Sequence, residues 1–281
     1  HRFATLLGFS VTVGVMGAMY GGAPVEMLMR DHGWMDVSKG LIILGAVLAG
    51  VTFMVFSNHK KDHEPKNPPS LRDDISALMR HKKVWWVALC AALMVGPLEG
   101  FADVWGRSFL INVYGLSKET AAFAPSLMFI GMAIGCPLLA RVSEKYNSFL
   151  SITRYAGLGM GILCILFLYF KLSVAILYPV FFVIGILSAY QVLAIHLNGV
   201  SVSKDHAGLV TAFTNMVIMS FGSVFHYGIG STMDLLWDGQ TAAGVPVYAP
   251  QAYSISLGLI PLGCFLGFIG FQKLMGKRQK A

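Results

Sequence analysis

The sequence of 281 residues is strongly apolar: hydrophobic residues make up 56% and charged residues only 12%, and the mean hydropathy is +0.66. In a soluble domain about half of the residues are hydrophobic and about a quarter are charged. So few charges exclude an ordinary water-soluble protein and require lipid around much of the surface. The net charge of +7 comes from basic residues between apolar runs. Such residues flank membrane helices, so no nucleic-acid partner is predicted.

Eight apolar stretches are long enough to cross the hydrocarbon core as helices, which takes about 20 residues each. They are continuous and lack the period-two alternation of a transmembrane barrel. The sequence therefore predicts an all-α integral membrane protein with eight transmembrane helices, at 3–29, 40–57, 84–110, 120–140, 150–170, 172–197, 207–230 and 253–274.

The basic residues between these spans are distributed unevenly. They gather in 58–83, 141–145 and 273–280, and the alternate loops hold only Arg30, Lys39, Lys118 and Lys171. By the positive-inside rule, both termini are predicted to be cytoplasmic and 231–252 to lie outside. We expect the plasma membrane, which in bacteria is the inner membrane.

The long basic segment 58–83 should carry a surface helix. Ser70 stands three residues before Asp73, as in an N-terminal capping arrangement. Apolar residues then recur at helical spacing, at Leu71, Ile75, Leu78 and Met79. We predict a short amphipathic helix along the cytoplasmic face.

Three features together suggest a family. The first span is rich in glycine and is followed by Gly33-Trp34, a long basic loop precedes a block of six spans, and Gly135-Cys136-Pro137 leads into the short loop that ends at Lys145. The chain thus resembles the major facilitator superfamily from that family's fifth helix to its end. The resemblance divides the chain into the last two helices of an N-terminal half, a cytoplasmic linker and a complete six-helix C-terminal half, at 1–57, 58–83 and 84–281.

The resemblance carries further expectations. The remaining N-terminal helices of the same protein would be the partner of this chain, or a second copy if the chain is complete. The short loop implies gating residues at Arg141, Glu144 and Lys145, although the family usually has Asp-Arg where Glu144-Lys145 stands. Ala18 occupies the place of an antiporter proline, so antiport is not indicated.

The third span carries the densest set of ionisable residues. Glu99, Asp103 and Arg107 follow one another at intervals of four, so an α-helix would place them on one face. Gly96-Pro97 just before them should weaken that helix. Charged residues inside a span are energetically costly and therefore suggest function. The three residues could instead lie in the water of the headgroup region at the outer end of the span, and for Arg107 the two interpretations are equally good.

Two carboxylates one turn apart in an apolar helix repel each other, so at least one should hold a proton near neutral pH. Glu99 and Asp103 are therefore the predicted proton-coupling residues. Arg107 is expected to pair with Asp103, which leaves Glu99 as the exchangeable site.

Four residues are candidate contacts for a transported solute: Arg107, Tyr190, Gln191 and Asn215. A Tyr-Gln pair in an apolar helix offers hydrogen-bond donors and acceptors to a polar solute. Hydrogen bonding between helices explains Tyr190 and Gln191 equally well, and Asn215 is open. By the resemblance, the third and sixth spans, which carry Arg107, Tyr190 and Gln191, line the cavity.

No phosphate loop, metal-binding histidine pair or Ser/His/Asp set is present, so no enzyme activity, cofactor or metal is predicted. The expected function is secondary active transport of a small polar or anionic organic solute, as a proton symporter in contact with membrane lipid. One alternative is efflux of amphipathic compounds, which would favour an aromatic, uncharged cavity. Another is a non-transporting membrane scaffold or sensor.

Overall fold

The computed structural model describes residues 3–21, 23–57, 71–203, 206–242 and 244–278, and these are helical almost throughout. Seven helical segments in these ranges are long and apolar enough to cross a membrane. They are α3 (Trp34–Ser57), α5 with η1 and α6 (Lys82–Ala92, Gly96–Trp105 and Gly106–Asn112), α7 (Lys118–Tyr146), α8 (Phe149–Tyr169), α9 with α10 (Val174–Ser188 and Tyr190–Gly199), α11 (Ala207–Leu235), and α12 with α13 (Pro250–Leu257 and Leu259–Arg278). The predicted all-α membrane fold is confirmed.

The predicted first span, 3–29, is not among these seven, so the count of eight is not confirmed. Two helices cover this region, α1 (Phe3–Gly21) and α2 (Ala23–His32). The second helix contains Arg30 and His32 in its last turn. Charged side chains are costly in lipid, which explains why the apolar run does not continue through α2.

The chain divides into two compact units, one of residues 1–16 and 78–281, the other of residues 17–77. In the smaller unit α2 contacts α3, and the turn between them is made at Gly33, whose φ of +78° favours glycine. Large apolar side chains of α3, such as Ile42 and Phe53, are exposed. Lipid is the solvent that suits such a helix.

The predicted amphipathic helix exists as α4 (Leu71–Arg80), in which Leu78 is buried and Met79 is exposed. The predicted cap at Ser70 lies outside the described residues.

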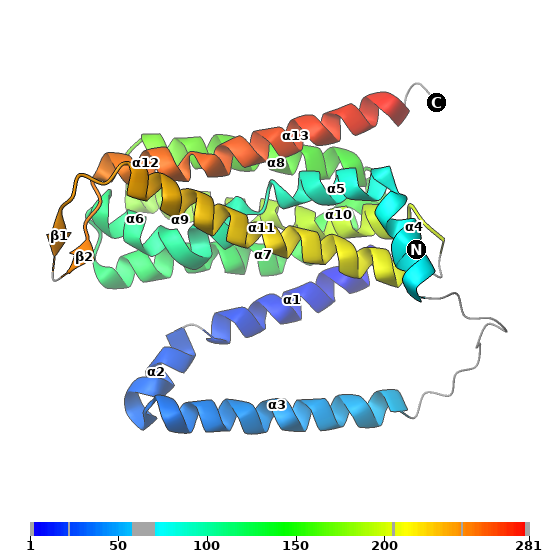
Figure 1. Cartoon of the computed structure of the whole chain (residues 1–281), viewed down its shortest axis with the longest axis horizontal. Coiled ribbons are helices and arrows are strands. Elements are labelled where there is room, and N and C mark those ends of the chain that lie inside the picture. The colour runs from blue at the N-terminus through cyan, green and yellow to red at the C-terminus, as the bar shows by residue number, and fades with distance from the viewer. Residues whose placement is uncertain (1–2, 22, 58–70, 204–205, 243, 279–281) are drawn as a thin grey trace. The chain divides into compact units, whose positions relative to one another are not determined.

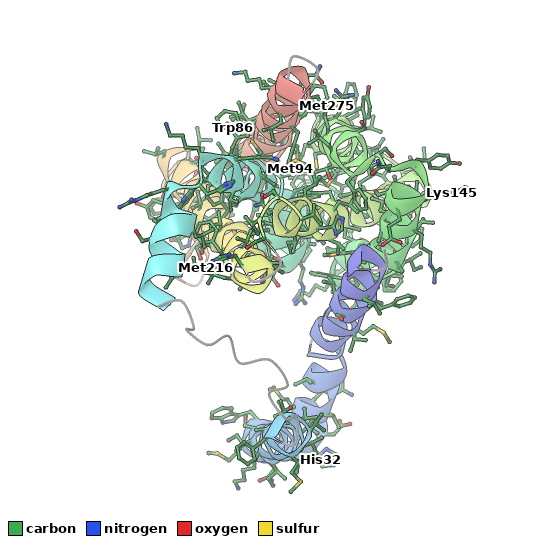
Figure 2. The ribbon with its side chains drawn as sticks, turned by 90° about the vertical axis from the view of Figure 1, so that its right-hand side faces the viewer. His32, Trp86, Met94, Lys145, Met216 and Met275 are labelled. Atoms are coloured by element: carbon green, nitrogen blue, oxygen red, sulfur yellow. The ribbon has the colours of Figure 1, made fainter. Side chains whose placement is uncertain are left out.

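In the larger unit the long helices run side by side along one direction (Figure 1). The most extensive contacts join α7 to α9 and α8 to α13. A hairpin of β1 (Thr241–Ala242) and β2 (Val245–Pro246) lies between α11 and α12 at one end. Figure 2 shows Met94 inside this bundle and Lys145 at its edge, and Met94 is fully buried.

Glycines let the helices of the bundle approach closely. A Cβ built at Gly131 of α7 would lie 2.2 Å from the carbonyl oxygen of Phe182, and one at Gly185 of α9 would lie 2.0 Å from that of Met128. Only a residue without a side chain fits such backbone contacts, and small residues commonly allow them between membrane helices.

The third span is interrupted where Gly96-Pro97 predicts a weak helix. The α-helix α5 ends at Ala92, and η1 (Gly96–Trp105) follows as a π-helix. At its end the N–H of Gly106 donates to the carbonyl of Phe101, five residues earlier. Proline cannot donate the backbone hydrogen bond that an α-helix requires there, and π-helical turns occur frequently at functional sites.

Candidate functional site

Glu99 lies on the π-helix η1, with its side chain against α11. The side chain is half-buried. A Cβ built at Gly222 of α11 would lie 3.2 Å from the Cβ of Glu99 and 3.4 Å from its Oε2. The absence of a side chain at Gly222 therefore makes the room in which the Glu99 carboxyl sits.

The main chain of Glu99 also contacts α11. The Nε2 atom of His226 lies 2.6 Å from the carbonyl oxygen of Glu99. His226 stands four residues after Gly222, one α-helical turn further along the same face. One stretch of α11 thus contacts both the backbone and the side chain of the same glutamate.

Apolar side chains pack against the part of η1 that carries Glu99. A Cβ at Gly96 would lie 3.0 Å from ring atoms of Phe225, and one at Gly100 would lie 3.5 Å from Ile229 and 3.6 Å from Ile260. Phe225 is 7% exposed, and both isoleucines are fully buried. Apolar side chains of α11 and α13 thus pack against the glycines on either side of Glu99 in η1.

Asp103 and Arg107 follow Glu99 but are exposed. Among the described residues, ion pairs join Arg30 to Asp31 and Lys39 to Asp36, and the expected pair between Asp103 and Arg107 is not formed. The π-helix explains the difference, because its wider turns change how residues four apart stack on one face. The structure keeps the three residues on one segment but separates Glu99 from the other two by burial.

Tyr190 and Gln191 of α10 are in a different environment. Tyr190 is fully buried and Gln191 is 5% exposed. The hydroxyl of Tyr190 donates to the carbonyl of Ala91 at 2.6 Å, close to the break between α5 and η1. The Tyr190 hydroxyl thus joins α10 to the end of α5, a hydrogen bond between helices.

Asn215 of α11 is exposed. It precedes Gly222 by seven residues and His226 by eleven, close to two and three helical turns, so all three share one face of α11. Its neighbour Thr214 instead points into the bundle, where its hydroxyl accepts from the Nδ2 of buried Asn198 at 2.9 Å. The side chain at position 215 is thus exposed on the face of α11 that also contains Gly222 and His226.

Arg141, Glu144 and Lys145 lie at the far end of α7. The helix ends at Tyr146, and the next residue, Asn147, adopts a left-handed conformation with φ of 46°. The N–H of Ser148 donates to the carbonyl of Ser143. The guanidinium of Arg141 lies 5.3 Å from the ring centroid of Phe9 in α1. Glu144 is near enough to His196 of α10 to interact with it electrostatically, and Lys145 is exposed.

A cavity of about 330 Å³ lies beside this end, lined by residues that include Ser148, Ser151, His196 and Met275. None of the nine predicted site residues, Glu99 included, lines this cavity. Within the described part of the chain, no group of three or more His, Cys, Asp or Glu residues could hold a metal ion.

His226 is not among the residues to which the sequence pattern gives a role. Its spacing of eleven from Asn215, together with Gly222 between them, was the available signal of a shared polar face. What the sequence could not reveal is the partner of this face, because the contact with Glu99 spans 127 residues.

Long apolar helices that bury polar side chains at a broken span define the class, an integral membrane protein of the helical bundle type. The family description "Major Facilitator Superfamily" matches residues 1–226. The chain belongs to this family and is a membrane transporter with a small-molecule solute as its partner, which confirms the predicted resemblance. No curated protein matches the sequence.

Proposed function

We propose that the protein is a secondary active transporter that moves a small polar or anionic organic solute together with protons. The observation that carries the proposal is the half-buried carboxyl of Glu99, which lies on a break in its span and against Gly222 of another helix. A carboxyl group in such surroundings is stable when protonated, and it loses its proton when water reaches it.

The exposed residues nearby supply contacts for the solute. Arg107 offers a permanent positive charge with five donors, which suits a carboxylate or phosphate. Asn215 offers both a donor and an acceptor on the exposed face of α11. These groups favour an anionic or polar solute over the amphipathic compounds of an efflux pump. Asp103 adds a negative charge that discourages a second ionised carboxylate at Glu99.

We assign the opening and closing of the transport pathway to residues at the far end of α7. Arg141 lies over Phe9 of α1, and Glu144 interacts with His196 of α10. Contacts of this kind between helix ends hold a gate closed until the helices move apart. We propose that Arg141, Glu144 and Lys145 form this gate.

Proton coupling is tested in liposomes that contain the protein and a pH-sensitive dye in their lumen. A panel of small carboxylates, amino acids and sugars is added outside. A solute that enters together with protons acidifies the lumen, and protein-free liposomes show the background. We expect Glu99→Gln to abolish acidification, whereas exchange of the radiolabelled solute across the membrane continues.

Asp103→Asn is the matched control, since it makes the same chemical change four residues away at an exposed position. It should reduce the acidification without abolishing it. Solute uptake without acidification in the unmodified protein would show that protons are not the coupling ion, and unchanged acidification in Glu99→Gln would exclude Glu99 as the carrier.

A further inference from the structure

We propose that His226 is a positioning residue for Glu99: through its hydrogen bond to the Glu99 carbonyl it holds the π-helical turn in the geometry that keeps the carboxyl against Gly222 and protonated. This inference rests on the proposed role of Glu99 as the proton carrier.

The chemistry of the contact fixes which nitrogen carries hydrogen. A carbonyl oxygen can only accept, so the Nε2 of His226, 2.6 Å from it, must donate. In a neutral imidazole the Nδ1 is then the acceptor. The hydrogen bond therefore constrains both the ring and the carbonyl, with Nε2 as the atom that any replacement has to reproduce.

The place of the contact explains its importance. Within a π-helix the hydrogen bonds run from one residue to the fifth before it, an arrangement that is rare and requires support from its surroundings. Glu99 lies inside η1, four residues before Asp103. A donor from α11 to the carbonyl of Glu99 stabilises this turn from outside, at the residue whose side chain carries the proton.

Steric contacts from the same face of α11 also constrain the position of Glu99. Gly222 leaves room for the Glu99 side chain, and Phe225 fits against Gly96 of η1. If the hydrogen bond is lost, the turn can relax towards an α-helix, which rotates the carboxyl away from Gly222 and towards the exposed side where Asp103 lies. There water stabilises the ionised form.

The other ionisable groups near this pair come from two helices. Asp103 on η1 and Tyr190 on α10 both interact electrostatically with Glu99. His226 does so as well, and a positive charge on its ring would favour the ionised carboxyl, so the positioning role belongs to the neutral imidazole. The phenol of Tyr190 donates to Ala91, and Asp103 is exposed. From α13 the side chain that approaches Gly96 and Gly100 is the apolar Ile260. Of the side chains named here, only that of His226 contacts the backbone of Glu99.

The test uses the protein in liposomes and dicyclohexylcarbodiimide as the probe, so it needs no knowledge of the solute. The reagent takes up the proton of a protonated carboxyl on one nitrogen, and the carboxylate oxygen bonds to its central carbon. The acyl group then migrates to nitrogen and leaves a stable N-acylurea. Mass spectrometry measures this adduct on Glu99 between about pH 5 and about pH 8, the range around neutrality in which a perturbed carboxyl titrates.

Three variants separate positioning from bulk packing. His226→Gln places an amide N–H close to the position of Nε2, His226→Asn is too short to reach the carbonyl, and His226→Leu has no donor. We expect labelling of Glu99 in His226→Gln to stay within about twofold of the unmodified protein. In His226→Asn and His226→Leu it should fall roughly fivefold at neutral pH, the effect of losing one hydrogen bond of about 1 kcal/mol.

A loss of folding alone would not produce rescue by glutamine together with failure of asparagine. Equal labelling in all four proteins would overturn the inference. If Glu99 in the unmodified protein is not labelled at any pH, the proposed proton carrier fails instead. His226 is then judged by amide hydrogen exchange of residues 96–106, which should be faster in His226→Leu and unchanged in His226→Gln; equal exchange in both would reject the positioning role.

Discussion

At the scale of single residues, polar groups of this protein differ in how far their hydrogen-bonding capacity is used within the fold. The Nδ2 of Asn198 donates to the carbonyl of Val84 at 3.1 Å and to Thr214, so this buried amide joins α5, α10 and α11. Asn215, one position after Thr214 in the chain, is exposed. Of these neighbouring polar positions, the buried one therefore serves the packing of the helices, and the exposed one is the candidate for a solute contact.

A tyrosine outside the spans gives a testable pH dependence. The hydroxyl of Tyr248 donates to the Oδ1 of Asp234 at 2.6 Å. This hydrogen bond to a carboxylate raises the pKa of the Tyr248 phenol, because ionisation would break it and place two negative charges together. The contribution of the contact to stability is fully present below about pH 10, the ordinary tyrosine value, and is lost as the pH rises through the higher folded-state pKa.

Ultraviolet absorbance of tyrosinate measures this shift, as the difference between the unmodified protein and Tyr248→Phe. We expect the difference to titrate above about pH 10 and to move to lower pH in Asp234→Asn, which lacks the negative charge. A difference that titrates at or below the ordinary value in the unmodified protein would contradict the contact.

At the scale of elements, the contact of η1 with α11 depends on glycine as much as on polar groups. Gly222 and Gly228 belong to the same helix, but their surroundings differ. A Cβ at Gly222 would lie 3.2 Å from the Cβ of Glu99, whereas one at Gly228 would meet only the Cδ1 of Leu259, at 3.4 Å. The distance at Gly228 is an ordinary van der Waals contact, whereas a Cβ at Gly222 would require Glu99 to move.

We therefore expect opposite effects of alanine at the two glycines. Alanine in place of glycine inside a helix stabilises by about 1 kcal/mol, and this gain should appear in Gly228→Ala as a higher Tm in detergent. In Gly222→Ala, overpacking of roughly 1–3 kcal/mol offsets the gain, and carbodiimide labelling of Glu99 should fall as the carboxyl is displaced. Equal labelling in both variants would show that Gly222 does not position the carboxyl.

At the scale of the whole molecule, the distribution of basic residues predicts how the chain lies in the membrane. Residues Leu236 to Ala249 connect α11 to α12 and are predicted to lie outside, and the end of α7 to lie in the cytoplasm. The four cysteines, Cys90, Cys136, Cys164 and Cys264, are buried. Their burial keeps the background low in a labelling experiment with an impermeant thiol reagent.

Two single cysteines test the topology in intact cells. Asp238→Cys should react from outside, whereas Tyr146→Cys should react only after the membrane is permeabilised; both positions are exposed in the structure. Asp238 is preferred to its neighbour Gly239, whose φ of +86° favours glycine. Reaction of Tyr146→Cys in intact cells, with protection of Asp238→Cys, would reverse the orientation.

The sequence by itself determined the class and most of the architecture, because lipid imposes a local requirement. Each span must be about 20 apolar residues long and must satisfy its own backbone hydrogen bonds, so composition and length are enough to locate the helices from α3 to α13. The break at Gly96-Pro97 was predictable for the same reason, since proline acts on its own helix.

Only the tertiary structure decided what surrounds each polar residue. The sequence left open whether Tyr190 and Gln191 contact a solute or a neighbouring helix, and the structure buries both. Glu99 is separated from Asp103 and Arg107 by burial, although the spacing of four predicted one face. The π-helical turn that causes this separation, and the contact of His226 with Glu99 across 127 residues, depend on how α11 packs against η1. Such packing is a property of distant pairs, which the local pattern of a sequence does not encode.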